Sequence, residues 1–174
     1  TGNRFKRSEG FVFKILYEIH KLLTLIFTGK MIRFGNFTCL SKKHVKQLIQ
    51  KPYLWNSYSS SVVKAIDERT FIPSERGLRY VLPSKMNFIA LVFHSFAIIS
   101  VFRNMVIVRS FLFLLVYLFL IFNNISTLTI IPVFFLLAFV FTILKISTRS
   151  DIEGFNKSLD NITSVDTLRS SNSR

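Results

Sequence analysis

Two short clusters of basic residues are the part of the sequence best suited to bind an anion. The first consists of Arg4, Lys6 and Arg7, and the second consists of Arg76, Arg79 and Lys85. An arginine guanidinium presents a planar fork of N–H donors that matches the oxygens of a phosphate group. Phosphate binding is therefore one interpretation. The other is that these residues lie beside a membrane and attract anionic lipid, at roughly 1 kcal/mol each, and composition alone favours this second interpretation.

Other kinds of site chemistry find little support in the sequence. It contains no glycine-rich phosphate loop, no nucleophile elbow, no paired-carboxylate spacing and no Cys/His cluster. We predict that Cys39 is a small buried residue, because no base accompanies it, and that His20 lies on a helix surface. The acidic pair Asp151 and Glu153 lies in a tail rich in Ser and Asn. No metal site is therefore predicted in this chain.

Charge is distributed unevenly along the 174 residues. Residues 1–85 hold 16 Lys and Arg against 5 Asp and Glu, a net charge of +11. Residues 86–144 carry only Arg103 and Arg109, and they include 12 of the 20 Phe. This apolar content excludes disorder of the whole chain, and a single cysteine excludes a disulfide-stapled secreted module. A basic polar part is thus joined to an apolar part.

Two apolar runs in the second part are candidates to cross a membrane. They cover residues 105–122 and 128–144, and at a rise of about 1.5 Å each reaches roughly 26 Å, close to the ~30 Å hydrocarbon core. Neither run has the polar stripe of a helix in a soluble core. We predict a transmembrane hairpin with its uncharged link, residues 123–127, outside and its basic flanks in the cytoplasm.

The segments on either side of the hairpin have a different character. Residues 86–104 are apolar but interrupted, and Asn87 and His94 fall on one face of a helix, which predicts an interfacial helix. A third span over residues 86–102 is the alternative, since 17 residues would just reach across. Residues 145–174 have the composition of a disordered tail.

Periodicity and capping residues predict two helices in the basic part. Polar residues recur at helical spacing over residues 11–28, and Gly29 is suited to end that helix. Ser41 is suited to begin a second helix, which should run to about Gln50 and stop at Pro52.

The remaining patterns of the basic part are weaker. Residues 33–40 alternate, which predicts a short strand, and residues 53–66 predict a further helix despite three consecutive serines at 59–61. Residues 68–86 are irregular and basic. The basic part should therefore be mostly helical, with short strands.

A stretch in front of the apolar helices resembles a motif of a known enzyme family. Arg79, Ser84 and Lys85 match a loop that contains an Arg, a Gly and Ser-Lys, with Leu82 in place of the Gly. This loop, followed by an interfacial helix and two spans, resembles the end of membrane-bound family 2 glycosyltransferases. The most similar group is the polyprenyl-phosphate type, which includes dolichol-phosphate mannose synthase.

Two further stretches extend the resemblance to roughly residues 3–145. Residues 35–41 resemble that family's Asp-Phe-Arg-Leu-Leu-Ser strand, with Asn36 at the Asp. Residues 4–9 resemble its arginine-bearing acceptor loop, which precedes a long amphipathic helix. Because Asn36 lacks the negative charge, the resemblance implies a positioning hydrogen bond there rather than an acid, base or metal ligand.

The resemblance implies an α+β membrane protein with four parts. Residues 1–85 would be the acceptor-side, C-terminal portion of a GT-A-type α/β catalytic domain, residues 86–104 an interfacial helix, residues 105–144 the two transmembrane helices and residues 145–174 a disordered tail. The protein would be multi-pass, with its catalytic part and tail in the cytoplasm. The family's nucleotide-binding half, with its Asp-x-Asp metal motif, is not among these residues.

The implied activity is transfer of a sugar from a nucleotide sugar to a lipid-linked acceptor, polyprenyl phosphate, at the cytoplasmic membrane face. Asn36 would occupy the catalytic position, and the residues that would hold phosphate groups are Arg4, Lys6, Arg7, Arg76, Arg79, Ser84 and Lys85. A divalent Mg²⁺ or Mn²⁺ would be bound outside this segment. The segment alone is therefore predicted to be inactive, as the cut-off end of a longer enzyme.

A non-enzymatic role is the alternative from another class. The chain would then be a basic membrane anchor or partner subunit that binds anionic lipid or a companion chain. Nucleic acid is not predicted as a partner, because no DNA- or RNA-binding fold signature accompanies the charge. The sequence leaves homo-oligomerisation open.

Overall fold

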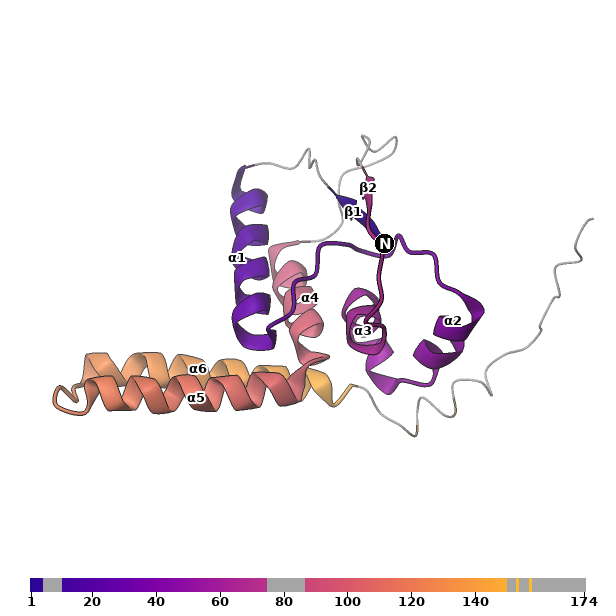
Figure 1. Ribbon diagram of the computed structural model, residues 1–174. Helices are drawn as coiled ribbons and strands as arrows, with labels where there is room; N and C mark the ends of the chain where they lie inside the picture. The colour runs from indigo at the N-terminus through magenta and orange to yellow at the C-terminus, as the bar shows by residue number, and fades with distance from the viewer. Residues whose placement is uncertain (5–10, 75–86, 150–152, 154–156, 158–174) are drawn as a thin grey trace, which may run out of the picture.

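The computed structural model describes residues 1–4, 11–74, 87–149, 153 and 157 of the chain (Figure 1). The described part is mostly helical, with two short strands and two helices long and apolar enough to cross a membrane. These broad features of the sequence-based prediction are confirmed. Predictions that concern residues 5–10, 75–86 and most of the tail lie outside the described part.

The two long apolar helices, α5 (Arg103–Ile121) and α6 (Thr127–Ser147), lie side by side and are joined by a short link (Figure 1). A capping box fixes the start of α6, because Ser126 and Thr129 each accept a hydrogen bond from the other's backbone N–H. Across the pair, Tyr117 Oη donates to the carbonyl oxygen of Thr129 at 2.9 Å. Residues 145–147, assigned to the tail by sequence, belong to α6.

Helix α4 (Phe88–Ser100) precedes this pair and crosses it steeply (Figure 1). Asn87 is its N-cap, since Asn87 Oδ1 accepts a hydrogen bond from the backbone N–H of Ala90 at 2.8 Å. With 13 residues, α4 is about 20 Å long, too short for the ~30 Å core of a bilayer. Helix α4 is therefore shorter than the 17-residue third span considered as an alternative.

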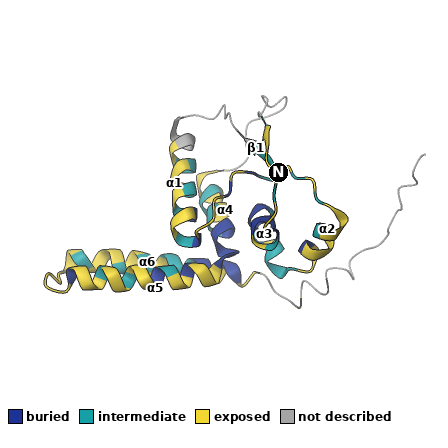
Figure 2. Cartoon of the chain, in the orientation of Figure 1, coloured by how far each residue is buried: buried dark blue, intermediate teal, exposed yellow. Residues whose placement is uncertain are grey.

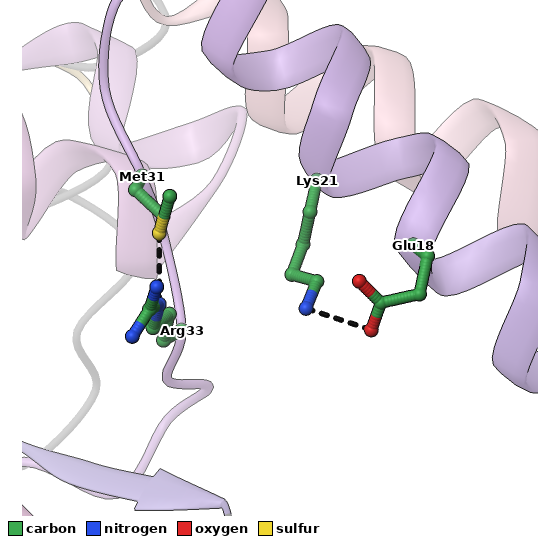
Figure 3. Close-up of polar contacts among 4 residues, drawn as sticks. All are labelled: Glu18, Lys21, Met31 and Arg33. Carbon is green, nitrogen blue, oxygen red and sulfur yellow. Dashed lines mark hydrogen bonds and ion pairs between the residues drawn. The ribbon is translucent and has the colours of Figure 1, made fainter.

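Helix α1 (Phe11–Thr28) contacts both α4 and α5. It ends where the sequence predicts, at Gly29, whose φ of 68° is the left-handed conformation that favours glycine. On its surface, Glu18 and Lys21 form an ion pair at 2.7 Å (Figure 3). The amphipathic helix predicted over residues 11–28 is confirmed.

Three short helical elements follow: α2 (Lys42–Ile49), the 3₁₀ helix η1 (Pro52–Trp55) and α3 (Tyr58–Ala65). Ser41 is the N-cap of α2, as predicted, and accepts from the backbone N–H of His44 at 3.4 Å. The prediction of one helix over residues 53–66 is wrong, because Pro52 opens a separate 3₁₀ turn and Ser57 is extended.

The predicted strand over residues 33–40 is also wrong. Within that segment only Phe34 forms a β-bridge, and the chain bends at Asn36. Cys39, expected to be buried, is exposed, because the chain does not alternate as a strand there. Its neighbour Thr38 forms a side-chain hydrogen bond with Tyr58.

The strands that form instead are β1 (Gly2–Arg4) and β2 (Ile72–Ser74). They form a two-stranded parallel sheet. Each has three residues, which is too short for an alternating pattern to be recognised, and Pro73 argues against a strand by propensity.

Two apolar clusters hold the helices together. The first lies among α2, α3, residues 32–34 and the end of α4, and its buried members are Ile32, Phe34, Leu48, Val62, Val63, Ile66, Ile98, Val101 and Phe102. The second lies where α1, α4, α5 and α6 meet, and its buried members are Ile99, Val106 and Ile143. Since the last turn of α4 supplies side chains to both clusters, it fixes the polar part of the chain onto the base of the α5–α6 pair.

Candidate phosphate-binding site at the strand pair

The parallel pairing of β1 and β2 brings together residues seventy positions apart in the sequence. Gly2 pairs with Ile72, Asn3 with Pro73 and Arg4 with Ser74. Ser74 Oγ also donates to the carbonyl oxygen of Asn3 at 3.1 Å. The two strands therefore run in the same direction and end beside one another, at Arg4 and at Ser74.

A third segment lies against the other edge of β1. Phe34 forms an antiparallel bridge with Asn3, and the backbone N–H of Gly2 donates to the carbonyl oxygen of Phe37 at 2.9 Å. A Cβ atom on Gly2 would lie 3.4 Å from both Phe37 Cβ and Ser74 Oγ, an ordinary van der Waals distance, so the three segments are closely packed here. Strand β1 thus lies between β2 and residues 34–37.

Asn36, the predicted catalytic residue, lies in this third segment. It occupies a bend between Phe34, which is buried, and Phe37, which is 72% exposed. The Asn36 side chain is itself exposed and so is accessible to a ligand. An amide in this position can donate or accept a hydrogen bond but cannot act as a general acid or base near neutral pH.

The predicted phosphate-binding residues begin at the same end of the strand pair. Arg4 is the last residue of β1, and its backbone pairs with Ser74. The others, Lys6, Arg7, Arg76, Arg79, Ser84 and Lys85, lie outside the described residues. The segments that carry them nevertheless start directly after Arg4 and after Ser74, and so start side by side.

The same two segments are followed in sequence by two helices that contact each other. Residues 5–10 lead into α1 and residues 75–86 lead, through Asn87, into α4. Helices α1 and α4 contact each other and both run from the side of the strand pair toward α5 and α6 (Figure 1). Each basic segment therefore connects one of two adjacent strands with one of two adjacent helices.

Arg33 adds a further positive charge next to the junction, and sequence reasoning did not select it. Its Nε donates to Met31 Sδ at 2.8 Å, and the side chain is exposed (Figure 3). The neighbouring Phe34 is turned into the core, so Arg33 is turned outward. The signal that could have identified it is its place three residues before Asn36 in the alternating segment.

Two other basic residues of the polar part have structural partners. Arg69 donates to the carbonyl oxygens of Val63 and Ile66 and so caps the end of α3. Lys64 Nζ donates to the carbonyl oxygen of Val101 at 2.6 Å and lies 4.3 Å from the ring centroid of Tyr53.

The surroundings of Lys64 and of the nearby Tyr53 shift the pKa values of both side chains. Burial first, and the positive charge of Arg103 second, lower the pKa of the Lys64 ammonium. Burial raises the pKa of the Tyr53 hydroxyl. Lys64 therefore serves to hold the end of α4 rather than to bind a ligand at the strand pair.

Neither a metal site among the described residues nor a match to a known protein helps to assign a function to this site. Among the described residues no group of three or more His, Cys, Asp and Glu side chains is placed to hold a metal ion. Comparison of the chain with protein-family models, with known proteins and with solved structures finds no match. Function must therefore be argued from the chemistry of the strand junction and of the apolar helices.

Proposed function

We propose that this chain is the acceptor-side and membrane-anchoring part of an enzyme that transfers a sugar from a nucleotide sugar to polyprenyl phosphate. Transfer takes place at the cytoplasmic face of the membrane. The α5–α6 pair forms the transmembrane hairpin, and the junction of β1, β2 and residues 34–37 positions the lipid phosphate. The polar part belongs to a GT-A-type catalytic domain in this proposal.

One observation supports the proposal above all. Arg4, the described end of the first stretch that resembles the glycosyltransferase motifs, pairs with Ser74, which precedes the third stretch by five residues. Its neighbour Asn3 bridges Phe34, which adjoins the second stretch. The third stretch itself lies outside the described residues. A basic membrane anchor has no need to bring these strand ends together, since its charges act on lipid independently of one another. An enzyme that binds one phosphate group with several residues does need to bring those residues together.

Each basic residue has a role in this proposal. Arg4, Arg7 and Arg79, with Ser84 and Lys85, hold acceptor or donor phosphates and offset the charge that develops on the leaving diphosphate. Lys6 and Arg76 add to the positive potential, and the amide of Asn36 orients a substrate oxygen. These groups bind and orient, and they stabilise charge without exchanging a proton.

The divalent ion that the family resemblance implies does not fit the described residues of this chain, which offer no cluster of ligands for it. No step is therefore assigned to a metal here. In this proposal the ion and the nucleotide are bound by residues outside these 174, and the junction contributes the acceptor side alone.

The direct test is sugar transfer by the enzyme that contains this chain. Membranes are supplied with polyprenyl phosphate and a panel of radiolabelled nucleotide sugars, and lipid-linked product is measured for the wild type and for Arg79→Ala. We expect Arg79→Ala to reduce turnover by about 10²-fold or more, the cost of removing one preorganised donor from a developing charge.

Lys43→Ala is the matched control, because Lys43 is exposed on α2, away from the strand junction, and its removal changes the net charge equally. This variant should retain normal turnover, and both variants should stay in the membrane fraction. Equal turnover of Arg79→Ala and Lys43→Ala would contradict the proposal. The protein would then be better explained as a basic anchor or partner subunit on anionic lipid.

A further inference from the structure

Helix α1 exposes a stripe of apolar side chains, although Leu23 and Phe27 on its inward side pack against other helices. Ile15, Ile19, Leu22 and Ile26 are 44%, 47%, 56% and 37% exposed. Their spacing of four, three and four residues places them in one stripe along the helix. On the inward side, by contrast, threonines are buried. If water surrounded this stripe, burial of the apolar side chains and exposure of the threonines would be favoured instead.

The two buried threonines of α1 have hydrogen-bond partners within the helix. Thr24 and Thr28 are 2% and 0% exposed. Thr24 Oγ1 donates to the carbonyl oxygen of His20 at 2.8 Å, and Thr28 Oγ1 donates to that of Thr24 at 2.6 Å. Because the hydroxyl groups have partners within the helix, burying them leaves no donor unsatisfied. The inward side of α1 can therefore pack against the other helices without an unsatisfied hydroxyl donor.

The end of α1 is fixed to the α5–α6 pair by specific contacts. Arg109 Nη1, on α5, donates to the carbonyl oxygen of Ile26 at 3.0 Å. A Cβ atom on Gly29 would lie 2.6 Å from Arg109 Nη2, so the guanidinium lies directly against this glycine. Phe27 also contacts the rings of Phe113, edge to face, and of Phe139, at a tilt, with ring-centroid distances of 5.8 and 4.5 Å. The orientation of α1 is therefore set by α5 and α6.

The α5–α6 pair extends beyond α1 on the side opposite to α4 (Figure 1). Helix α1 crosses the pair rather than running along it, and α4 lies on the side of α1 nearer to α3 (Figure 1). Side-chain contacts agree with this order of the helices along the pair. Phe27 of α1 contacts Phe113 of α5, whereas Ile99 of α4 packs with Val106, which is nearer the start of α5. The stripe thus belongs to a helix that crosses the pair, with the link end of the pair beyond it (Figure 1).

We infer that the stripe of α1, formed by Ile15, Ile19, Leu22 and Ile26, lies on the membrane surface with its side chains in the acyl-chain boundary. The occupant of the stripe is the lipid bilayer that α5 and α6 enter. A helix in this position buries its apolar face by roughly 5–10 Å, which matches a single exposed stripe. The inference rests on the membrane-anchoring part of the proposed function and is independent of sugar transfer.

Continuity of the apolar surface identifies lipid as the occupant. The stripe adjoins α5 and α6, whose own apolar side chains are exposed along most of their length (Figure 2). Lys30 and Arg33, which follow α1, are exposed and suited to lipid headgroups. The interfacial role predicted for residues 86–104 thereby extends to α1, whereas the last turn of α4 is buried in protein.

Quenching by brominated lipid tests this inference on the whole chain. In a Trp55→Phe background, Ile19→Trp introduces a single tryptophan on the stripe, and Val45→Trp is the matched control on exposed α2. Vesicles contain phosphatidylcholine and phosphatidylglycerol with bromine atoms at carbons 6 and 7 of one acyl chain. We expect at least about two-fold quenching of the Ile19→Trp variant relative to unbrominated vesicles, as the burial depth requires, and little quenching of the Val45→Trp variant.

Equal quenching of the two variants would overturn the inference. So would a second copy on the stripe, which would leave the Ile19→Trp variant unquenched and would let Ile19→Cys, in a Cys39→Ser background, form a disulfide-linked dimer. The readout involves neither donor nor acceptor, so it separates this inference from the enzymatic proposal. Loss of transfer in Arg79→Ala, together with an unquenched Ile19→Trp variant, would overturn the inference alone.

Discussion

The α2–η1–α3 block and the α5–α6 pair place the same kinds of side chain in opposite surroundings. In the block, Val62 and Val63 are 0% and 3% exposed. In the pair, Phe119 and Leu128 are 81% and 78% exposed (Figure 2). Apolar surface of this extent is stable only where something other than water covers it. Apolar side chains of the block are thus covered by other parts of the protein. Those of the α5–α6 pair need apolar surroundings outside the described chain.

Polar side chains show the same contrast from the other direction. Ser60 and Ser61, in α3, are fully buried. Ser61 Oγ donates to the carbonyl oxygens of Ser57 and Tyr53, at 2.7 and 3.0 Å. Burial in this molecule therefore does not follow hydropathy alone, because serines lie inside the block, including Ser60, whose hydroxyl has no hydrogen-bond partner among the described residues, while phenylalanines cover the outside of the pair.

Truncating one leucine in each region should have the most unequal effect on stability. Leu48→Ala, at a side chain that is 3% exposed, should reduce the free energy of unfolding by about 2–5 kcal/mol, because it removes buried contacts and leaves a cavity. Leu120→Ala, at a side chain that is 70% exposed, should change it by less than about 0.5 kcal/mol. Urea unfolding in detergent micelles, followed by Trp55 fluorescence, measures both. Similar losses would contradict the division into two regions.

A charge added to the pair should have the next largest effect, on membrane insertion rather than on folding of the block. Leu137→Lys, near the middle of α6, should disfavour insertion by about 2.5–3.5 kcal/mol. Ile49→Lys, at a side chain of α2 that is 54% exposed, should leave insertion unchanged. Resistance to alkaline carbonate extraction reports insertion. Normal insertion of Leu137→Lys would mean that this part of α6 does not meet lipid.

Gly29 tests the connection between the two regions. Gly29→Ala should destabilise the fold by about 1–2 kcal/mol, the cost of a side chain in the left-handed conformation, and contact with the Arg109 guanidinium should add to it. Unfolding in micelles measures the loss. In the double variant Gly29→Ala with Arg109→Ala, the contact is absent, so the two losses should sum to more than the observed loss. Strict additivity would show that Arg109 does not press on this position.

Lys64 should give the smallest effect, visible as a dependence on pH. Its folded-state pKa is lowered, so the unfolded chain binds more protons between the folded pKa and the ordinary lysine pKa. Wild-type stability relative to Lys64→Met should therefore rise as the pH increases through this window. Tyr53, whose pKa is raised, titrates with the opposite sign but is present in both proteins. A difference that falls with pH would contradict the burial of Lys64.

Local signals explain what the sequence allowed us to predict. The end of α1 and the start of α2 are determined by residues within a few positions of each boundary, namely Gly29 and Ser41. The apolar runs that become α5 and α6 are identified by composition alone. In these elements, the interactions that define the structure lie between neighbours in sequence.

Pairing between distant residues explains what the sequence concealed. β1 and β2 are stabilised by each other across seventy positions, and neither has a pattern of its own. The break between η1 and α3 comes at Ser57, whose backbone is extended, a feature that the local pattern did not indicate. The meeting of β1, β2 and residues 34–37 at one junction, and the exposed apolar stripe of α1, likewise depend on tertiary contacts.

Binding of polyprenyl phosphate by this chain tests the central claim most directly. The chain is reconstituted in nanodiscs, and its affinity for polyprenyl phosphate is measured against phosphatidylglycerol at equal surface charge, for the wild type, Arg79→Ala and Lys43→Ala. We predict preferential binding of polyprenyl phosphate that Arg79→Ala weakens by about 10-fold or more, the cost of a charge-assisted hydrogen bond, while Lys43→Ala leaves it unchanged. Equal affinity for both lipids, or equal weakening by both variants, would contradict a dedicated phosphate site at the strand junction.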